Sequence, residues 1–191
     1  AGKKERVEEG ELQITDYGIS GIPVFQFSRF AARALAEKKK VQVLIDFLPF
    51  MGEEESRVFL KERFAVFGQR KGEDFLNGVV HKKLAHVLLK TAGIPLGEPV
   101  GETSKKQRNM LFYALKEYDA LVSSVNPFAN AQVCSGGVDT AQVDAHTMES
   151  KLVDDLYFAG EILDVDGRCG GYNLQWAWST GKIAGVQAAQ W

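Results

Sequence analysis

The hydrophobic pattern of this chain changes its period twice, and this change limits the possible folds more than any other feature. Short β-type runs surround one helical stretch in residues 11–50, apolar side chains recur at three- and four-residue steps in residues 53–116, and β-type runs return after residue 117. Steps of three and four residues place apolar side chains on one face of a helix. We therefore expect an α+β protein with a helical subdomain inserted between β-containing segments.

The first fifty residues are predicted to form a strand, a helix and a second strand. ELQIT, at 11–15, is β-prone, and the glycines and proline of DYGISGIP mark a turn that leads into a helix ending near Lys39. One face of this helix is apolar. The run VQVLIDFLP, at 41–49, has the β-branched and apolar content of a buried strand.

The segment 53–116 is predicted to contain three or four helices. Its most regular apolar stripes are Val58, Phe59, Phe64 and Phe67; Val79, Val80, Leu84, Val87 and Leu88; and Met110, Leu111, Ala114 and Leu115. Ser104 is a candidate N-cap for the last helix, with Gln107 three residues later as the glutamine form of a capping box. After Tyr118, the runs DALVSSV and AQVCSGGV on either side of Asn126-Pro127 suggest a hairpin.

Composition and charge argue against several classes of protein. The 191 residues are 45% hydrophobic, and the formal net charge of -2 gives no field that would gather nucleic acid or anionic lipid. Apolar runs are far shorter than the roughly 20 residues of a membrane-spanning helix. The polar start is no signal peptide, so a cytoplasmic location is expected. The chain begins with Ala-Gly rather than Met, which suggests a fragment of a longer protein.

No metal site is expected. The two cysteines and three histidines lack the spacing of metal ligands. DVDG, at 164–167, could suggest calcium, but an EF-hand loop from Asp164 would need Gly at position 169 and Glu at 175, where this chain has Cys and Gln. A turn whose aspartates bond their own backbone is as good an interpretation of this loop as a direct role in binding a ligand.

The segment LYFAGE, at 156–161, places a carboxylate at the end of an apolar run. As a buried strand, this run would bring Glu161 out at its carboxyl end, where α/β sheets bind ligands. Gly160 would allow a ligand to approach the backbone closely. A carboxylate accepts hydrogen bonds but repels phosphate, so it suits a neutral polyol such as a ribityl chain. Pairing of Glu161 with Arg168 for the fold alone is the alternative, and the residues themselves favour neither.

A helix is predicted to begin just after Gly170-Gly171, with Asn173 as its N-cap and a small-residue face at Ala177, Gly181, Ala184, Gly185 and Ala188. The free N–H groups of Leu174, Gln175 and Trp176 would then face an anion or an electron-rich carbonyl. A flavin satisfies both sites, with its ribityl chain near Glu161 and a pyrimidine carbonyl near the helix start. Trp176 and Trp178 face different sides, and at least one is expected in the core.

Three quoted stretches resemble one family. CSGGVDT, the run from TMESKLVDDLYFAGEI to STGKIAG, and the early GELQITDYGISGIPVFQFSRF resemble the bacterial NAD(P)/FAD-dependent oxidoreductases described as aminoacetone-oxidase-like or bile-acid-reductase-like flavoproteins. The resemblance is strong at both ends and loose through the helical block. It implies that Gly160 and Glu161 bind the ribityl chain of FAD. It also implies that the helix start of Asn173, Leu174 and Gln175, preceded by Gly171, meets the isoalloxazine ring, with Gly136 and Gly137 near that ring.

The chain departs from the family in one respect. Such flavoproteins begin with a strand and a GxGxxG motif that binds the pyrophosphate, whereas no two glycines here are separated by a single residue. We therefore expect a β-containing insert domain (1–52 and 117–150), a helical subdomain (53–116) and the C-terminal strand-loop-helix piece of an FAD-binding Rossmann-like domain (151–191). The expected partners are the missing N-terminal half of the FAD domain, a small-molecule substrate and NAD(P)H. The alternative is a non-catalytic docking or substrate-covering module without a cofactor.

Overall fold

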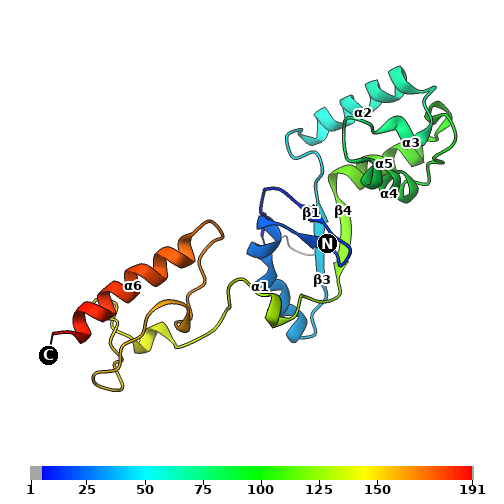
Figure 1. Ribbon diagram of the computed structural model, residues 1–191. Coiled ribbons are helices and arrows are strands. Elements are labelled where there is room, and N and C mark those ends of the chain that lie inside the picture. The colour runs from blue at the N-terminus through cyan, green and yellow to red at the C-terminus, as the bar shows by residue number, and fades with distance from the viewer. Residues whose placement is uncertain (1–5, 191) are drawn as a thin grey trace. The chain divides into compact units, whose positions relative to one another are not determined.

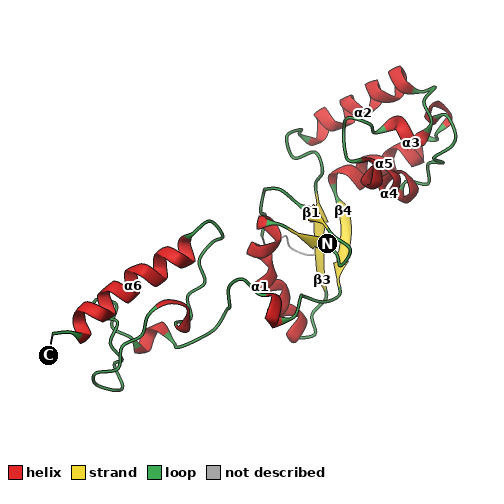
Figure 2. Cartoon of the chain, in the orientation of Figure 1, coloured by secondary structure: helices red, strands yellow, loops and turns green. Residues whose placement is uncertain are grey.

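The computed structural model describes residues 6–190 of the chain. The fold divides into two compact units: one joins the residues up to Lys39 to those from Ser123 onward, and the other is Lys40–Val122. Both units combine helices with short strands (Figures 1 and 2). Every predicted site residue belongs to the first unit.

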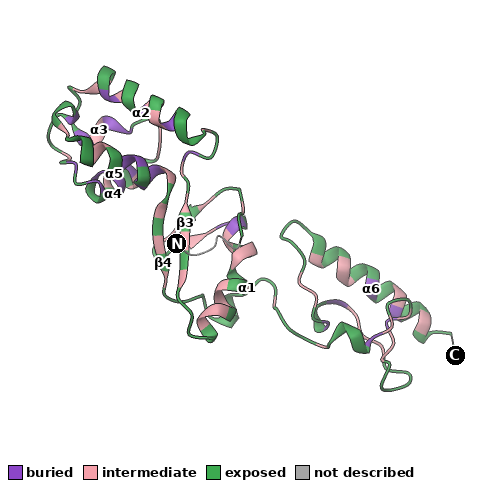
Figure 3. Cartoon of the chain, turned by 180° about the vertical axis from the view of Figure 1, so that it is seen from behind, coloured by how far each residue is buried: buried purple, intermediate pink, exposed green. Residues whose placement is uncertain are grey.

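Four α-helices form the body of the Lys40–Val122 unit. They are α2 (Glu53–Phe67), α3 (Gly72–Phe75), α4 (Lys82–Thr91) and α5 (Lys105–Lys116). The helices α2, α4 and α5 overlap the three predicted apolar stripes, although Val79 and Val80 precede α4, and no stripe predicts α3. Their apolar faces share one core that includes the fully buried Phe75, Leu88 and Leu111, and Figure 3 shows buried residues gathered on these helices. The compact unit is wider than the predicted helical subdomain, because it also contains two flanking strands.

Helix α5 begins with the predicted capping box. The Ser104 hydroxyl accepts a hydrogen bond from the backbone N–H of Gln107 at 3.3 Å, and the Gln107 side chain accepts one from the Ser104 N–H at 2.9 Å. Both donors belong to the group of N–H bonds that a helix start leaves without an intrahelical acceptor. This local motif therefore fixes where the helix begins.

The two strands of this unit pair with each other, although the four helices separate them in the sequence. β3 (Val41–Ile45) and β4 (Tyr118–Val122) are antiparallel, with Val41 opposite Val122 and Ile45 opposite Tyr118. Burial alternates along β3, so the prediction of a fully buried strand is wrong. Side chains of a strand point to opposite faces in turn, and only one face of this two-stranded ladder is covered.

The hairpin predicted about Asn126-Pro127 is also wrong. β4 pairs with β3, and beyond Val122 the residues up to Gly137 form only a 3-10 turn at Phe128–Asn130. Gly136 and Gly137 have φ values of 104° and 146°, which an ordinary strand does not use. β3 offers five consecutive residues in register, so it is the better partner for β4 although it is far away in sequence.

The other unit consists of short elements and two longer helices. They are β1 (Gln13–Ile14), β2 (Ile19–Ser20), α1 (Ile22–Ala36), the 3-10 turns Thr140–Gln142 and Gly160–Ile162 (η3 and η4), and α6 (Tyr172–Ala188). β1 and β2 form a small antiparallel pair before α1. The helix α1 ends three residues before the predicted Lys39. A small core of Val143, Met148, Leu163 and Ala184 lies under α6.

The strand predicted at 156–161 is not formed. Tyr157 makes one isolated antiparallel bridge with Glu149, and the chain then turns into η4 at Gly160. The N–H of Phe158 donates to the carbonyl of Met148 at 2.9 Å. A strand needs a continuous ladder, and among residues 6–190 this run has a neighbour on one side only, at 148–150. The prediction is therefore wrong for the described structure, although the run does end at an exposed Glu161.

Candidate functional site

Gly160 is held from both sides by side chains of α6. Its N–H donates to the hydroxyl of Thr180 at 2.9 Å, and its carbonyl accepts from the indole N–H of Trp176 at 3.1 Å. The Thr180 hydroxyl in turn donates to the carbonyl of Trp176 at 2.7 Å, so this 2% exposed group is fully used. Gly160 has a φ of 71°, in the left-handed region that favours glycine. The turn that presents Glu161 is therefore fixed by α6.

Glu161 is exposed, and one of its carboxylate oxygens accepts a hydrogen bond from the backbone. Oε1 accepts a hydrogen bond from the backbone N–H of Cys134. The alternative pairing with Arg168 is not formed, because that guanidinium lies 3.4 Å from the carboxylate of Glu8. Desolvation raises the pKa of the Cys134 thiol, and the charge of Glu161 and a hydrogen bond to it raise this pKa further. The thiol is therefore a poor nucleophile at neutral pH.

The segment with Gly136 and Gly137 lies directly beside Glu161. The N–H of Val138 donates to the carbonyl of Ile162 at 2.8 Å, and the N–H of Asp164 donates back to Val138 at 2.9 Å. A Cβ on Gly137 would collide with the carbonyl oxygen of Ile162, whereas one on Gly136 would meet no atom within 4 Å. The structure thus brings both predicted glycines to the predicted carboxylate. Gly136 borders open space.

Asn173 is not the N-cap of α6, as predicted, but lies in its first turn. The helix begins at Tyr172, and Gly171 occupies the cap position with a φ of 91°. The Asn173 side chain instead bridges Gly167, accepting from its N–H at 2.7 Å and donating to its carbonyl at 3.1 Å. Glycine allows the left-handed cap conformation at position 171, and the loop offers the Asn173 amide two partners. Hence this residue holds the acidic loop in place.

The earlier start of α6 also changes which N–H groups face outward. The N–H of Gln175 already donates to the carbonyl of Gly171 at 3.0 Å, so the prediction of free N–H groups at Gln175 and Trp176 is wrong. The groups before the first intrahelical bond are those of Tyr172, Asn173 and Leu174. They keep the partly positive character of a helix start.

Both aspartates of the acidic loop have structural partners. Asp164 accepts from the N–H of Gly136 at 3.0 Å, and Asp166 forms an ion pair with Arg29 of α1. Neither carboxylate bonds only the backbone of its own turn. Each already uses one oxygen within the fold, so neither has both oxygens available to bind a ligand. The loop therefore ties the Gly136 segment and α1 to the start of α6.

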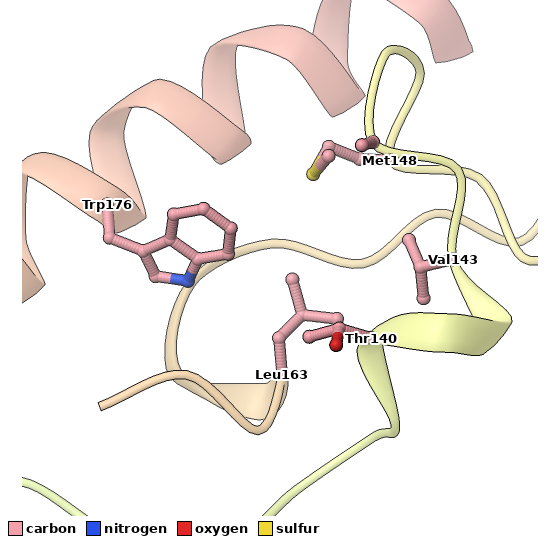
Figure 4. Close-up of a pocket in the computed structure, with 6 residues that line it drawn as sticks. Thr140, Val143, Met148, Leu163 and Trp176 are labelled. Carbon is pink, nitrogen blue, oxygen red and sulfur yellow. The ribbon is translucent and has the colours of Figure 1, made fainter. Parts of the chain in front are cut away.

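A small apolar cavity lies under Trp176. It has a volume of about 70 Å³ and is lined by Thr140, Val143, Ala145, Met148, Leu163 and Trp176. In Figure 4 the indole ring projects from α6 toward Leu163. Two or three water molecules would fill such a volume, since a water occupies about 30 Å³. The cavity is too small for a flavin ring, and Glu161 does not line it.

Comparison with known proteins gives the family. Residues 9–187 match the HI0933-like protein Rossmann domain family. The chain belongs to this family. It is 45% identical over 183 residues to a 3-dehydro-bile acid delta(4,6)-reductase of Clostridium scindens, a match that covers 96% of this chain and 45% of that protein. The family resemblance stated from the sequence is therefore confirmed.

Two further relatives are described by a different activity. The chain is 34% identical over 170 residues to a ribosomal RNA dihydrouridine synthase of Haemophilus influenzae, covering 89% of this chain and 40% of that protein. It is 32% identical over 174 residues to an Escherichia coli protein with the same description, covering 88% and 40%. The chain thus spans less than half the length of the curated relatives it matches.

The contacts that hold the Gly160 turn were not predicted from the sequence. Thr180 and the indole N–H of Trp176 hold Gly160, and neither was predicted to do so. The available signal was a threonine four residues after a tryptophan on a helix otherwise rich in small residues. Trp176 does lie against the small core while Trp178 is exposed, so the expectation that one of the two is a core residue is confirmed.

Residues 6–190 contain neither a helix that could span a membrane nor a cluster of metal-ligand side chains. No helix in residues 6–190 is both long and apolar enough to cross a membrane. Within the same residues no group of three or more His, Cys, Asp or Glu side chains is placed to hold a metal ion.

Proposed function

We propose that this chain is a portion of an FAD-dependent oxidoreductase and that Glu161 binds the ribityl chain of the cofactor. The observation that carries the proposal is the geometry of Glu161. One carboxylate oxygen is fixed by the Cys134 N–H, and the preceding residue is fixed by α6. The carboxylate belongs to an exposed side chain, and within residues 6–190 it interacts with the backbone N–H and the thiol of Cys134. A carboxylate has about four acceptor positions, so it can also accept a hydrogen bond from a ligand hydroxyl group.

The residues around Glu161 fit the central part of a flavin cofactor. Gly136 and Gly171 border open space, because a Cβ built on either would meet no atom within 4 Å. The N–H groups of Tyr172 and Leu174 at the start of α6 suit a pyrimidine carbonyl, which becomes more negative when the ring is reduced. FAD bound there would supply reversible hydride transfer. The chain would hold it, orient it and support it with the Gly160 turn.

The pyrophosphate end of FAD would need residues of a longer parent protein. The chain has no GxGxxG motif, and the N-terminal half of the FAD domain is the partner that we propose. The outer face of α6 is suited to contact it. Leu174 and Trp178 are 60% and 67% exposed, and Val186 is exposed on the same helix. An apolar face of this kind is typical of a surface that another chain segment covers.

The activities named for the relatives suggest a reaction class. A delta(4,6)-reductase and a dihydrouridine synthase both produce a saturated carbon–carbon bond from a double bond. We propose the same for the parent protein: a hydride adds to one carbon of an electron-poor double bond, a proton adds to the other, and NAD(P)H restores the reduced cofactor. Steroid-like substrates have the greater support, because the bile acid reductase is 45% identical to this chain.

The alternative is a non-catalytic docking or substrate-covering module. Its supporting observation is that Glu161 is exposed and does not line the small cavity under Trp176. An absorbance spectrum of the purified chain tests whether the flavin site is complete without the rest of the parent protein. Stoichiometric flavin absorbance would show a complete site in this chain, and we expect none.

The decisive test uses the full-length parent protein. Glu161→Ala removes an acceptor for a ribityl hydroxyl, and losing a hydrogen bond to a charged group costs about 1.5–3 kcal/mol. We expect FAD affinity to fall by roughly tenfold or more. Asp154→Ala is the matched control, because Asp154 is an exposed carboxylate of the same unit with no contact among the hydrogen bonds and ion pairs of residues 6–190. Equal FAD affinity in both variants would refute the role of Glu161.

A further inference from the structure

An open groove with mostly apolar surface runs along α2 as far as Glu62. It has a volume of about 500 Å³ and is lined by Phe50, Met51, Glu54, Glu55, Val58, Phe59 and Glu62. Phe50, just before the helix, is 72% exposed, and Val58 in the middle of the groove is 45% exposed. The volume lies in the range of sites that take a ligand or a few large side chains, roughly 300–1,000 Å³.

Two carboxylates at this groove, those of Glu54 and Glu62, form no ion pair within residues 6–190. Glu53 pairs with Arg57 at 2.8 Å, and Glu55 accepts from the N–H of Gly52 at 2.9 Å, so both are used within α2. No hydrogen bond or ion pair involves the side chain of Glu54 or Glu62 among the residues that the structure describes.

The spacing of these carboxylates follows one helical stripe. Glu54, Val58 and Glu62 are four residues apart, and the equally spaced Val66 is 72% exposed. Acidic and apolar side chains therefore alternate along one line of α2. Eight residues of helix separate the two carboxylates by about 12 Å, which is slightly more than two helical turns.

We propose that this groove binds an amphipathic helical segment of a partner protein, in which lysine or arginine side chains about two turns apart flank large apolar side chains. The apolar side chains would contact Phe50 and Val58, and the cations would meet Glu54 and Glu62. Helices bind grooves through anchors at such spacings. The same carboxylates oppose nucleic acid and anionic lipid, since like charges close together are unfavourable.

The test uses the 191-residue chain and two labelled helical peptides. One peptide carries lysines about two turns apart around leucine anchors, and the other carries glutamates in place of the lysines. Fluorescence anisotropy should show binding of the lysine peptide only. Glu54→Gln with Glu62→Gln should weaken this binding by about three- to tenfold, since each exposed ion pair contributes little alone. Phe50→Ser should weaken it by removing an apolar contact.

The control variant is Glu98→Gln with Glu102→Gln, which removes two exposed carboxylates outside the groove of the same unit. It should leave peptide binding unchanged. Binding of both peptides, binding of neither, or an equal loss in the control would overturn the proposal. Sedimentation equilibrium tests a second copy as occupant, and a dimer that Phe50→Ser dissociates would also overturn it. Failure of this test leaves the FAD proposal intact, because Glu161 belongs to the other unit.

Discussion

Leu88 on α4 and Trp178 on α6 are both large apolar residues in regular helices, but only Leu88 is buried. Leu88 is fully enclosed by the core of the Lys40–Val122 unit, together with side chains from all four helices. Trp178 is 67% exposed, and the core beneath α6 contains only four buried side chains. One region is thus stabilised by a shared apolar interior. The other is stabilised by individual hydrogen bonds, such as those that α6 makes to Gly160.

This difference explains where apolar periodicity is a reliable guide. Burial of apolar area is non-directional, so any helix with a suitable stripe can contribute to a core such as that of α2–α5. A hydrogen bond between one side chain and one peptide group produces no repeating pattern of residues in the sequence. The region from Ser123 onward depends on such bonds at Asn173, Thr180 and Asp164.

The largest expected effect comes from the core of the helical unit. Leu88→Ala should destabilise that unit by about 3 kcal/mol, because it removes fully buried methyl groups and leaves a cavity. All three tryptophans lie after residue 175, so tryptophan fluorescence reports on the other unit while far-UV circular dichroism reports on helices of both. In urea, the dichroism transition should move to lower concentration and the fluorescence transition should stay in place.

Leu163→Ala is the reciprocal variant. Leu163 is 2% exposed in the small core beneath α6, so this substitution should move the fluorescence transition. If Leu88→Ala shifts the fluorescence transition as much as the dichroism transition, the two units unfold as one and the comparison fails.

Much of the helical unit could be predicted from the sequence. Stripes at three- and four-residue steps indicate α2, α4 and α5, and the Ser104–Gln107 box gives the first residue of α5. The pairing of β3 with β4 could not be read, because their partners are more than seventy residues apart. The turn signal at Asn126-Pro127 favours a local hairpin, but the positive φ values of Gly136 and Gly137 do not fit its second strand.

The sequence indicated which residues form the candidate site, but not the hydrogen bonds that hold them in place. Gly136, Gly137, Gly160 and Glu161 do come together, whereas their roles toward a cofactor stay predictions. Asn173 was given the wrong role, since a cap and a loop bridge use the same amide and only the φ of Gly171 separates them. The prediction of a strand before Glu161 was wrong because a strand needs neighbouring strands to pair with. The sequence of a single segment does not show whether such neighbours exist.

A smaller effect is expected where hydrogen bonds replace burial. Thr180→Val keeps the shape of the side chain but leaves the N–H of Gly160 without its acceptor. An unsatisfied buried donor costs about 1–3 kcal/mol. Hydrogen exchange at the Gly160 amide should become at least fivefold faster, whereas Thr180→Ser, which retains the hydroxyl, should exchange nearly as slowly as the unchanged protein. Equal rates in all three proteins would show that the Gly160 turn does not depend on this bond.

The smallest expected effect concerns pH and again separates the two units. The backbone N–H groups of His146 and Thr147 donate to Asp144 at 2.8 and 3.2 Å and lower its pKa from the ordinary value of 3.8. A carboxylate with a depressed pKa in the folded state contributes stability that is fully present above 3.8 and is lost as the pH falls through the lower folded value. The urea midpoint followed by tryptophan fluorescence should therefore fall more steeply below this pH in the unchanged protein than in Asp144→Asn, which cannot titrate.

Asp144 belongs to the unit that contains the residues from Ser123 onward. The urea midpoint of the helical unit should therefore be the same in the two proteins at any pH. A midpoint that falls equally in both proteins would show that other groups cause the acid sensitivity, and that the Asp144 turn adds nothing measurable to the stability of this unit.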